Sequence, residues 1–131
     1  MLEPADLAVL ADPVAAIIDP GGMIWFALLG DEVVGTSAVM PHGPGTLELA
    51  KMAVSPAVQG RGVGRLLGEA CIAFAHTTDA HTLMLLSNAT LAPALHLYEK
   101  LGFRHAPMPA GSDYARANVH MTMTLDRQGA R

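Results

Sequence analysis

A glycine-rich segment, Gln59–Arg65, has the residue types and spacing of a phosphate-binding loop. Its glycines alternate as Gly60, Gly62 and Gly64, so a ligand can approach the backbone without meeting a Cβ atom. An apolar run that ends at Val54 precedes the segment and a helical pattern follows it. The free N–H groups of the first helical turn would therefore point at the same place, which suits a phosphate or pyrophosphate.

The neighbouring residues exclude two other kinds of phosphate-binding loop. A dinucleotide-binding fingerprint is excluded because it requires glycine where Arg65 stands. A nucleotide P-loop is excluded because the segment lacks the glycine-lysine-serine/threonine ending. Easing a tight strand-to-helix turn is the alternative that stays open. The remaining pattern, Gln59-x-x-Gly62-x-Gly64, resembles the acyl-coenzyme A loop of the GNAT acetyltransferase superfamily.

A second segment, Ser87–Phe103, carries the same resemblance. It begins with Asn88 and continues into a helical run that ends Leu-Tyr-Glu-Lys-Leu-Gly-Phe, similar to the second hallmark of the superfamily. The two motifs stand in the family's order and at its spacing. The resemblance covers most of the chain, from about Met23 to about Leu125.

The resemblance implies that acetyl-coenzyme A is the cosubstrate. Its pantetheine arm would lie between two splayed parallel strands, Leu47–Val54 and Thr82–Ser87, with an N–H of Ala53 or Met52 facing the thioester oxygen. Its pyrophosphate would rest on the amides of Gln59–Arg65. The implied cofactor-binding residues are Met52, Ala53, Val54, Gln59, Gly60, Arg61, Gly62, Val63, Gly64, Arg65, Asn88 and Tyr98. The side chains of the two arginines either reach phosphates or are solvated at the surface.

Two polar residues of the second motif have implied roles. Tyr98 would be the general acid that protonates the departing thiolate; the alternative is one more face residue of its helix. Asn88 would hold the end of the preceding strand and bond the pantetheine or a water molecule. The alternative for Asn88 is a cap or turn into the next helix.

Glu48 is the candidate general base. In a regular strand it shares a face with Ala50, Met52 and Val54, so its carboxylate stands among apolar side chains. Burial there should raise its pKa toward that of a useful proton acceptor, and an acidic residue at this place resembles the base of several superfamily members. The alternative is a structural carboxylate paired with a neighbour such as Lys51 or an arginine.

Hydrophobic periodicity predicts the elements that position these residues. The expected strands are Met23–Leu29, Val33–Met40, Thr46–Val54, Thr82–Ser87, Arg104–Ala106 and Asn118–Leu125. The expected helices are Gly62–His76 and Ala92–Leu101, with Leu2–Ile18 forming one helix or two short ones. The fold class is α/β (α+β): a mixed, mostly antiparallel sheet with a splayed parallel pair at its centre and helices on its flanks.

The segment before Met23 departs from the superfamily pattern. Members usually begin with a strand and a longer pair of helices, so we expect the first strand and first helix to be missing here, through a shortened fold or a downstream start site. The Met23–Leu29 strand would then lie at a sheet edge, whose unpaired backbone invites another chain. A homodimer is therefore expected.

Composition favours one globular domain over residues 1–131. The chain has 131 residues, of which 51% are hydrophobic and 15% charged. No apolar run approaches the ~20 residues of a membrane helix and none has signal-peptide flanks, so a cytoplasmic location is expected. A net charge of -4 argues against a nucleic-acid partner. The single cysteine, Cys71, excludes an internal disulfide and lies on an apolar helical stripe, where we expect it to be buried.

No metal site is expected, because none of the histidines has the spacing of metal ligands. The histidines are His42, His76, His81, His96, His105 and His120. His42, Tyr114 and Arg116 either rim the acceptor pocket or are surface residues. The predicted function is acetyl transfer to a primary amine of a small molecule or peptide, by direct attack in a ternary complex. The alternatives are a non-catalytic acyl-coenzyme A-binding module and a protein N-terminal or lysine acetyltransferase.

Overall fold

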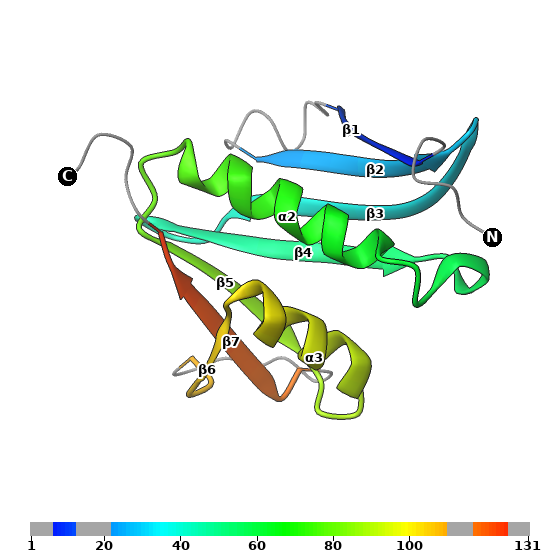
Figure 1. Cartoon of the computed structure of the whole chain (residues 1–131). Coiled ribbons are helices and arrows are strands. Elements are labelled where there is room, and N and C mark those ends of the chain that lie inside the picture. The colour runs from blue at the N-terminus through cyan, green and yellow to red at the C-terminus, as the bar shows by residue number, and fades with distance from the viewer. Residues whose placement is uncertain (1–6, 13–21, 110–116, 126–131) are drawn as a thin grey trace.

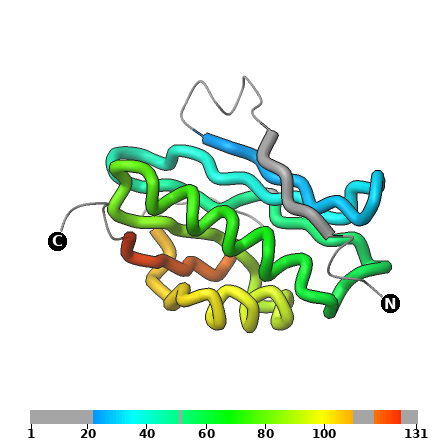
Figure 2. The backbone as a smooth tube through the Cα atoms, turned by 45° about the horizontal axis from the view of Figure 1, so that its top comes forward, coloured from blue at the N-terminus to red at the C-terminus, as the bar shows by residue number. Residues whose placement is uncertain are grey.

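In the computed structural model of the chain the described residues are 7–12, 22–109 and 117–125; the side chains of 7–12 and of Lys51 are outside this description. Seven strands form one mixed sheet in the order β1-β2-β3-β4-β5-β7-β6, and two helices cover one of its faces (Figures 1 and 2). The strands are β1 (Leu7–Asp12), β2 (Met23–Leu29), β3 (Glu32–Pro41), β4 (Thr46–Val54), β5 (Thr82–Ser87), β6 (Arg104–Ala106) and β7 (Val119–Thr124). The helices are α2 (Val63–His76), α3 (Ala92–Leu101) and the short 3-10 helix η2 (Pro56–Val58).

The core lies between the sheet and the two helices. On α2, Cys71 is fully buried and its sulfur lies 3.1 Å from the hydroxyl of Ser37 on β3. Trp25 of β2 packs edge-on against Phe74 of α2, with ring centroids 5.4 Å apart. The expected burial of Cys71 is therefore confirmed, and the thiol serves as a small apolar side chain of the core.

The predicted elements from β2 onward are confirmed, with boundaries that agree to within a residue or so. The end of α3 shows why: Gly102 adopts a φ of 111°, a left-handed conformation that glycine reaches at little cost. The next N–H, that of Phe103, then donates to the Tyr98 carbonyl at 3.0 Å and closes the helix. Pro93 lies in the first turn of α3, where its missing N–H removes no helical hydrogen bond.

The expected N-terminal helix is wrong for residues 7–12, which form strand β1. β1 pairs antiparallel with β2, from Leu7 opposite Leu29 to Asp12 opposite Ile24. A run this short contains too few turns for three- and four-residue spacing to separate a helix from a strand, and pairing with β2 decides the outcome. The remainder of the Leu2–Ile18 prediction lies outside the described residues.

Because β1 pairs with β2, the expectation of a missing first strand is also wrong. β2 has a partner on both sides, β1 and β3, and is not the edge of the sheet. The argument for a homodimer from an unpaired β2 therefore fails, while the homodimer itself stays a prediction.

The parallel pair at the centre of the sheet separates part-way along its length, as expected. β4 and β5 pair only from Thr46 opposite Thr82 to Glu48 opposite Met84. Beyond this point β5 continues along β7 while β4 follows β3 (Figure 1). The two strands thus form a fork that opens toward their C-terminal ends, with Glu48 at the last paired position of β4.

A bulge in β4 changes which residues share a face. Thr36 of β3 lies opposite Ala53, and Ala38 lies opposite Ala50, so three steps along β4 match two along β3. Because the extra residue reverses the alternation, Glu48 and Ala50 share a face with Ala53. The expected common face of Glu48 with Met52 and Val54 is therefore wrong.

Val54 lies instead on the helix-covered face. A Cβ added to Gly64 of α2 would meet a Val54 methyl group at 3.7 Å. The bulge therefore separates Glu48 and Val54 onto opposite faces of the sheet.

Candidate active site

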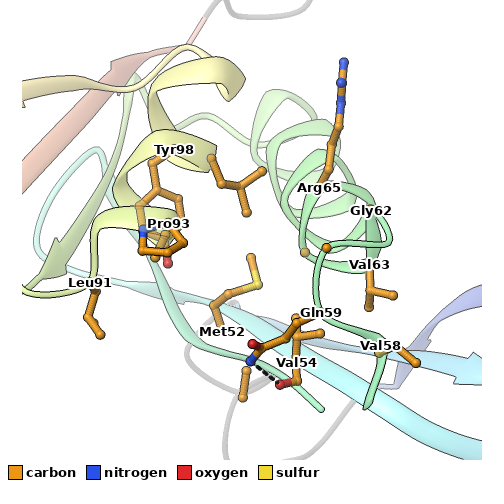
Figure 3. Close-up of a pocket in the computed structure, with 15 residues that line it drawn as sticks. Met52, Val54, Val58, Gln59, Gly62, Val63, Arg65, Leu91, Pro93 and Tyr98 are labelled. Carbon is orange, nitrogen blue, oxygen red and sulfur yellow. Dashed lines mark hydrogen bonds between the residues drawn. The ribbon is translucent and has the colours of Figure 1, made fainter. Parts of the chain in front are cut away.

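A groove of about 680 Å³ lies at the open end of the β4–β5 fork, between α2 and α3 (Figure 3). Its walls come from the end of β4, the loop after it, the start of α2 and the exposed face of α3. The lining residues are Met52, Ala53, Val54, Val58, Gln59, Gly60, Gly62, Val63, Gly64, Arg65, Leu91, Pro93, Ala94, Leu97 and Tyr98. The groove brings together most of the residues that the sequence predicted to bind acetyl-coenzyme A.

The loop before α2 is fixed by its own hydrogen bonds. Ser55 accepts a bond from the N–H of Ala57 at 3.4 Å, which starts the short helix η2. The side chain of Gln59 donates to the Val54 carbonyl at 3.3 Å and ties the loop to the end of β4 (Figure 3). Gln59 thus has a structural partner in addition to its place in the groove wall.

Glycine is required in this loop by backbone conformation rather than by crowding. Gly60 and Gly62 have φ values of 79° and 86°, which disfavour a side chain, although a Cβ at either would have open space around it. Gly62 is the N-cap of α2 and provides no side-chain cap. The N–H groups of the first turn are therefore available to an anion in the groove, together with the positive end of the helix dipole.

The two arginines of the loop occupy different places. Arg65 is one of the residues that line the groove, but its Nε donates to Glu69 at 3.1 Å and its side chain points away from the groove (Figure 3). Arg61 is exposed and does not line the groove. In this structure the Arg65 side chain forms an exposed i,i+4 ion pair, and phosphate contacts by either arginine stay a prediction.

Tyr98 is almost fully buried, 7% exposed, and its ring points into the groove from α3 (Figure 3). The ring packs edge-on against Phe103, with centroids 6.1 Å apart and planes at 72°. Burial raises the pKa of the Tyr98 phenol above its ordinary value, and the nearby Cys71 raises it further. The phenol therefore stays protonated at neutral pH, as a proton donor to a leaving group requires.

Asn88 does not line the groove, and its hydrogen bonds match the alternative role of a turn residue. Its side-chain oxygen accepts from the N–H of Thr90 at 3.0 Å and from the Thr90 hydroxyl at 2.9 Å. Its carbonyl accepts from the N–H of Leu91 at 2.9 Å. Asn88 thus shapes the entry to α3, and its predicted contact with pantetheine is not tested by these bonds.

Glu48 lies at the base of the fork and does not line the groove. Its carboxylate oxygen Oε1 is 3.2 Å from Nδ1 of His42, in the turn between β3 and β4. The two side chains are 22% and 37% exposed, so the pair is partly open to solvent. The Lys51 side chain, another expected partner of Glu48, lies outside the described residues, as do Tyr114 and Arg116.

Helix α3 contributes an apolar wall to the groove that was not predicted from the sequence. Leu91 is 51% exposed just before the helix, and Ala94 and Tyr98 follow it at helical spacing on the groove side. An apolar stripe that reaches past the buried core is a signal for such a wall. From the sequence alone, however, the same stripe predicts side chains that pack in the core.

The described residues can also be searched for a metal-binding cluster and for a membrane-spanning helix. Within residues 7–12, 22–109 and 117–125, no cluster of histidine, cysteine, aspartate and glutamate could hold a metal ion. None of the helices in the described part of the chain is long and apolar enough to cross a membrane.

A family model described as "Acetyltransferase (GNAT) domain" matches residues 20–105. Among curated proteins, N-acetylaspartate synthetase from Homo sapiens is 36% identical over 107 residues, which are 81% of this chain and 34% of that protein. The chain thus spans about a third of the length of this relative and of its counterpart in Rattus norvegicus. An uncharacterized N-acetyltransferase from Bacillus subtilis, YvbK, is 33% identical over 76% of this chain and 66% of its own.

A solved structure has the same fold with the cofactor bound. This putative acetyltransferase from Salmonella typhimurium, in complex with acetyl-CoA, is 27% identical to the chain, with a TM-score of 0.72. The match covers 88% of this chain and 71% of that protein. The glycine loop, the forked strands and the matched family model agree. The chain therefore belongs to the GNAT acetyltransferase family.

Proposed function

We propose that the chain transfers an acetyl group from acetyl-coenzyme A to a primary amine of a small molecule, by direct attack in a ternary complex. The observation that carries this proposal is that one groove is lined by both the glycine loop and Tyr98. The loop supplies anion-binding amides and Tyr98 supplies a buried, protonated hydroxyl. These are the two groups that delivery and release of a phosphate-bearing thioester require.

Different residues of the groove bind different parts of acetyl-coenzyme A. The amides of Gln59–Arg65 bind the pyrophosphate at the positive end of α2. The backbone of Met52, Ala53 and Val54 pairs with the pantetheine amides beyond the bulge, where β4 has separated from β5. A bulge leaves backbone groups out of the ladder, and Met52 lies within it, so its N–H is available to the thioester oxygen as charge develops there. The N–H of Ala53, which lies opposite Thr36 in the ladder, is the alternative donor.

The chemical step needs one proton acceptor and one proton donor. A bond forms between the amine nitrogen and the acetyl carbon, and the bond from that carbon to sulfur breaks. Glu48 takes the proton that the amine loses, directly or through water. Tyr98 gives its hydroxyl proton to the departing sulfur. The proton count balances, since one proton enters the protein at Glu48 and one leaves it at Tyr98.

A small-molecule acceptor is favoured over a protein by the names of the curated relatives. N-acetylaspartate synthetases are among them, and mycothiol acetyltransferases match as well. One solved structure of the same fold, from Escherichia coli, is a ribosomal-protein-S18-alanine N-acetyltransferase, so peptide acceptors belong in any test.

Thiol release with a panel of amines tests the proposal. The panel contains aspartate and other amino acids, amino sugars, and peptides with a free N-terminus or a lysine; a reaction without amine measures background hydrolysis. We expect release above background with at least one small amine, together with an acetylated product of matching mass. Heat of coenzyme A binding without release from any amine would identify a non-catalytic binding module. No heat of binding would overturn the proposal altogether.

A further inference from the structure

The partner of Glu48 is a histidine that has no assigned role in the proposed reaction. His42 Nδ1 lies 3.2 Å from Glu48 Oε1, and neither side chain lines the groove. The two groups form an ion pair when the imidazole is protonated. The contact therefore uses one oxygen of the carboxylate and leaves Oε2 for another partner.

The turn that carries His42 is fixed to three strands. The His42 N–H donates to the Thr46 carbonyl at 2.9 Å, which closes the turn between β3 and β4. The Gly45 carbonyl accepts from the N–H groups of His81 and Thr82, at 2.9 and 3.3 Å, which fixes the turn to the start of β5. Gly45 has a φ of 69°, and a Cβ there would collide with the His81 ring, so the turn has little freedom to move. His42 is therefore held at a defined height beside the base of the fork.

Glu48 is confined on both sides by neighbouring strands. The register places Met40 of β3 and Met84 of β5 beside it, and Met84 is only 3% exposed. Two apolar neighbours leave His42 as the described side chain that can orient the carboxylate. The register of β4, with its bulge, puts this carboxylate on the sheet face opposite that of Val54, away from the groove wall.

We infer that His42 is a positioning residue for Glu48: the contact of its Nδ1 with Oε1 orients the carboxylate, so that Oε2 faces the acceptor amine at the fork. This inference rests on the proposed function and extends it to the acceptor. An amine arrives at neutral pH largely as an ammonium ion, which a fixed carboxylate attracts. One ammonium proton passes to water, and Glu48 receives the second proton, which the nitrogen loses as it attacks the acetyl carbon. The acceptors that fit are therefore cationic primary amines that approach Glu48 from the sheet face opposite α2 and α3.

Three substitutions at position 42 separate positioning from simple packing. His42→Asn keeps an N–H close to the place of Nδ1, whereas His42→Gln moves it toward the place of Nε2 and His42→Ala removes it. With the best amine of the panel, we expect His42→Ala and His42→Gln to lower kcat by up to about 100-fold, the scale of a small misplacement of a catalytic group. His42→Asn should keep most of the turnover. The KM for acetyl-coenzyme A and the heat of coenzyme A binding should stay at wild-type values in all three variants.

A matched control is available in the second histidine–glutamate pair of the described residues. His105 Nε2 lies 3.0 Å from Glu99 Oε2, at a more exposed site away from the fork, and His105→Ala should leave turnover unchanged. In the Glu48→Gln background, His42→Ala should cause no further loss, because a positioning residue acts only through the group that it holds.

The results separate a failure of the proposed function from a failure of the inference about His42. Wild-type protein that transfers acetyl to no amine overturns the proposed function and this inference with it. Active wild-type protein with an equally active His42→Ala variant overturns the inference alone. The inference alone is also overturned if His42→Ala causes the same loss of turnover in wild type and in the Glu48→Gln background. Equal activity of His42→Asn and His42→Gln would overturn it as well.

Discussion

Replacing Tyr98 by phenylalanine should remove one oxygen atom from the groove and leave its wall in place. The ring is held by burial and by edge-on packing against Phe103, with centroids 6.1 Å apart, and phenylalanine keeps both. Tyr98→Phe therefore tests the hydroxyl without creating a cavity. We expect coenzyme A affinity and the free energy of unfolding to change little.

The size of the effect follows from the assigned role. A positioned general acid contributes about 10²- to 10⁴-fold to a rate, so kcat should fall by at least about 100-fold, or ~2.7 kcal/mol of activation free energy. The pKa of the phenol is raised from 10.0, first by burial and then by Cys71. Its active, protonated form therefore persists to a higher pH than that of an ordinary tyrosine and is lost as the pH rises through the raised pKa of the folded protein. Any alkaline decline of wild-type kcat from this group should accordingly have its midpoint above pH 10.0.

The assay is the initial rate of thiol release over roughly pH 6 to 10, with the amine saturating and acetyl-coenzyme A varied so that kcat and KM are both obtained. Wild type and Tyr98→Phe should differ in kcat and agree in the KM for acetyl-coenzyme A. A folded phenylalanine variant with kcat within about threefold of wild type would refute the assignment of Tyr98 as general acid.

Three other predictions concern the loop, its arginine and the buried thiol. Gly62→Ala and Gly30→Ala should each lower the free energy of unfolding by about 1–2 kcal/mol, because both positions have positive φ and open space for a Cβ. Calorimetry should show a loss of coenzyme A affinity only for Gly62→Ala. Arg65→Ala should cost less than about 0.5 kcal/mol in urea unfolding, since its pair with Glu69 is exposed; a weaker salt dependence of coenzyme A binding in this variant would show that Arg65 also reaches phosphate. Burial raises the pKa of Cys71 from 9.0 to about 11. The contribution of this thiol to the free energy of unfolding should therefore be fully present below pH 9.0, and about 3 kcal/mol should be lost as the pH rises through 11. Cys71→Ala should reduce this alkaline loss in urea unfolding measured at several pH values, and an unchanged loss would contradict the assignment.

Strands β4 and β5 and helix α3 were predictable because local signals agree with tertiary structure there. β5 reads Thr-Leu-Met-Leu-Leu-Ser, an almost continuous apolar run that only a buried central strand accommodates. α3 has proline in its first turn and glycine after its last, and both signals act within a few residues. The glycine loop was identified for the same reason, since its φ requirement is local.

The bulge, strand β1 and the His42–Glu48 contact were not predictable because they depend on pairing between distant segments. Between Ala50 and Ala53 no glycine or proline marks the bulge, and only the register against β3 reveals it. β1 exists through its pairing with β2, which overrides an ambiguous local pattern. His42 reaches Glu48 because a tight turn folds one strand back on the other, and the sequence places five residues between two side chains that touch.

The extra residue in β4 has a consequence for how the strand tolerates a change of length. Deleting one amino acid between Ala50 and Ala53 would restore regular alternation and leave these two residues two positions apart, still on one face of the sheet. The deletion would therefore return the bulged backbone to the ladder without moving the side chains of the fork or the groove to the other face. Such a variant should fold, and a loss of coenzyme A affinity in it would assign the unpaired backbone of β4, rather than its side chains, to cofactor binding.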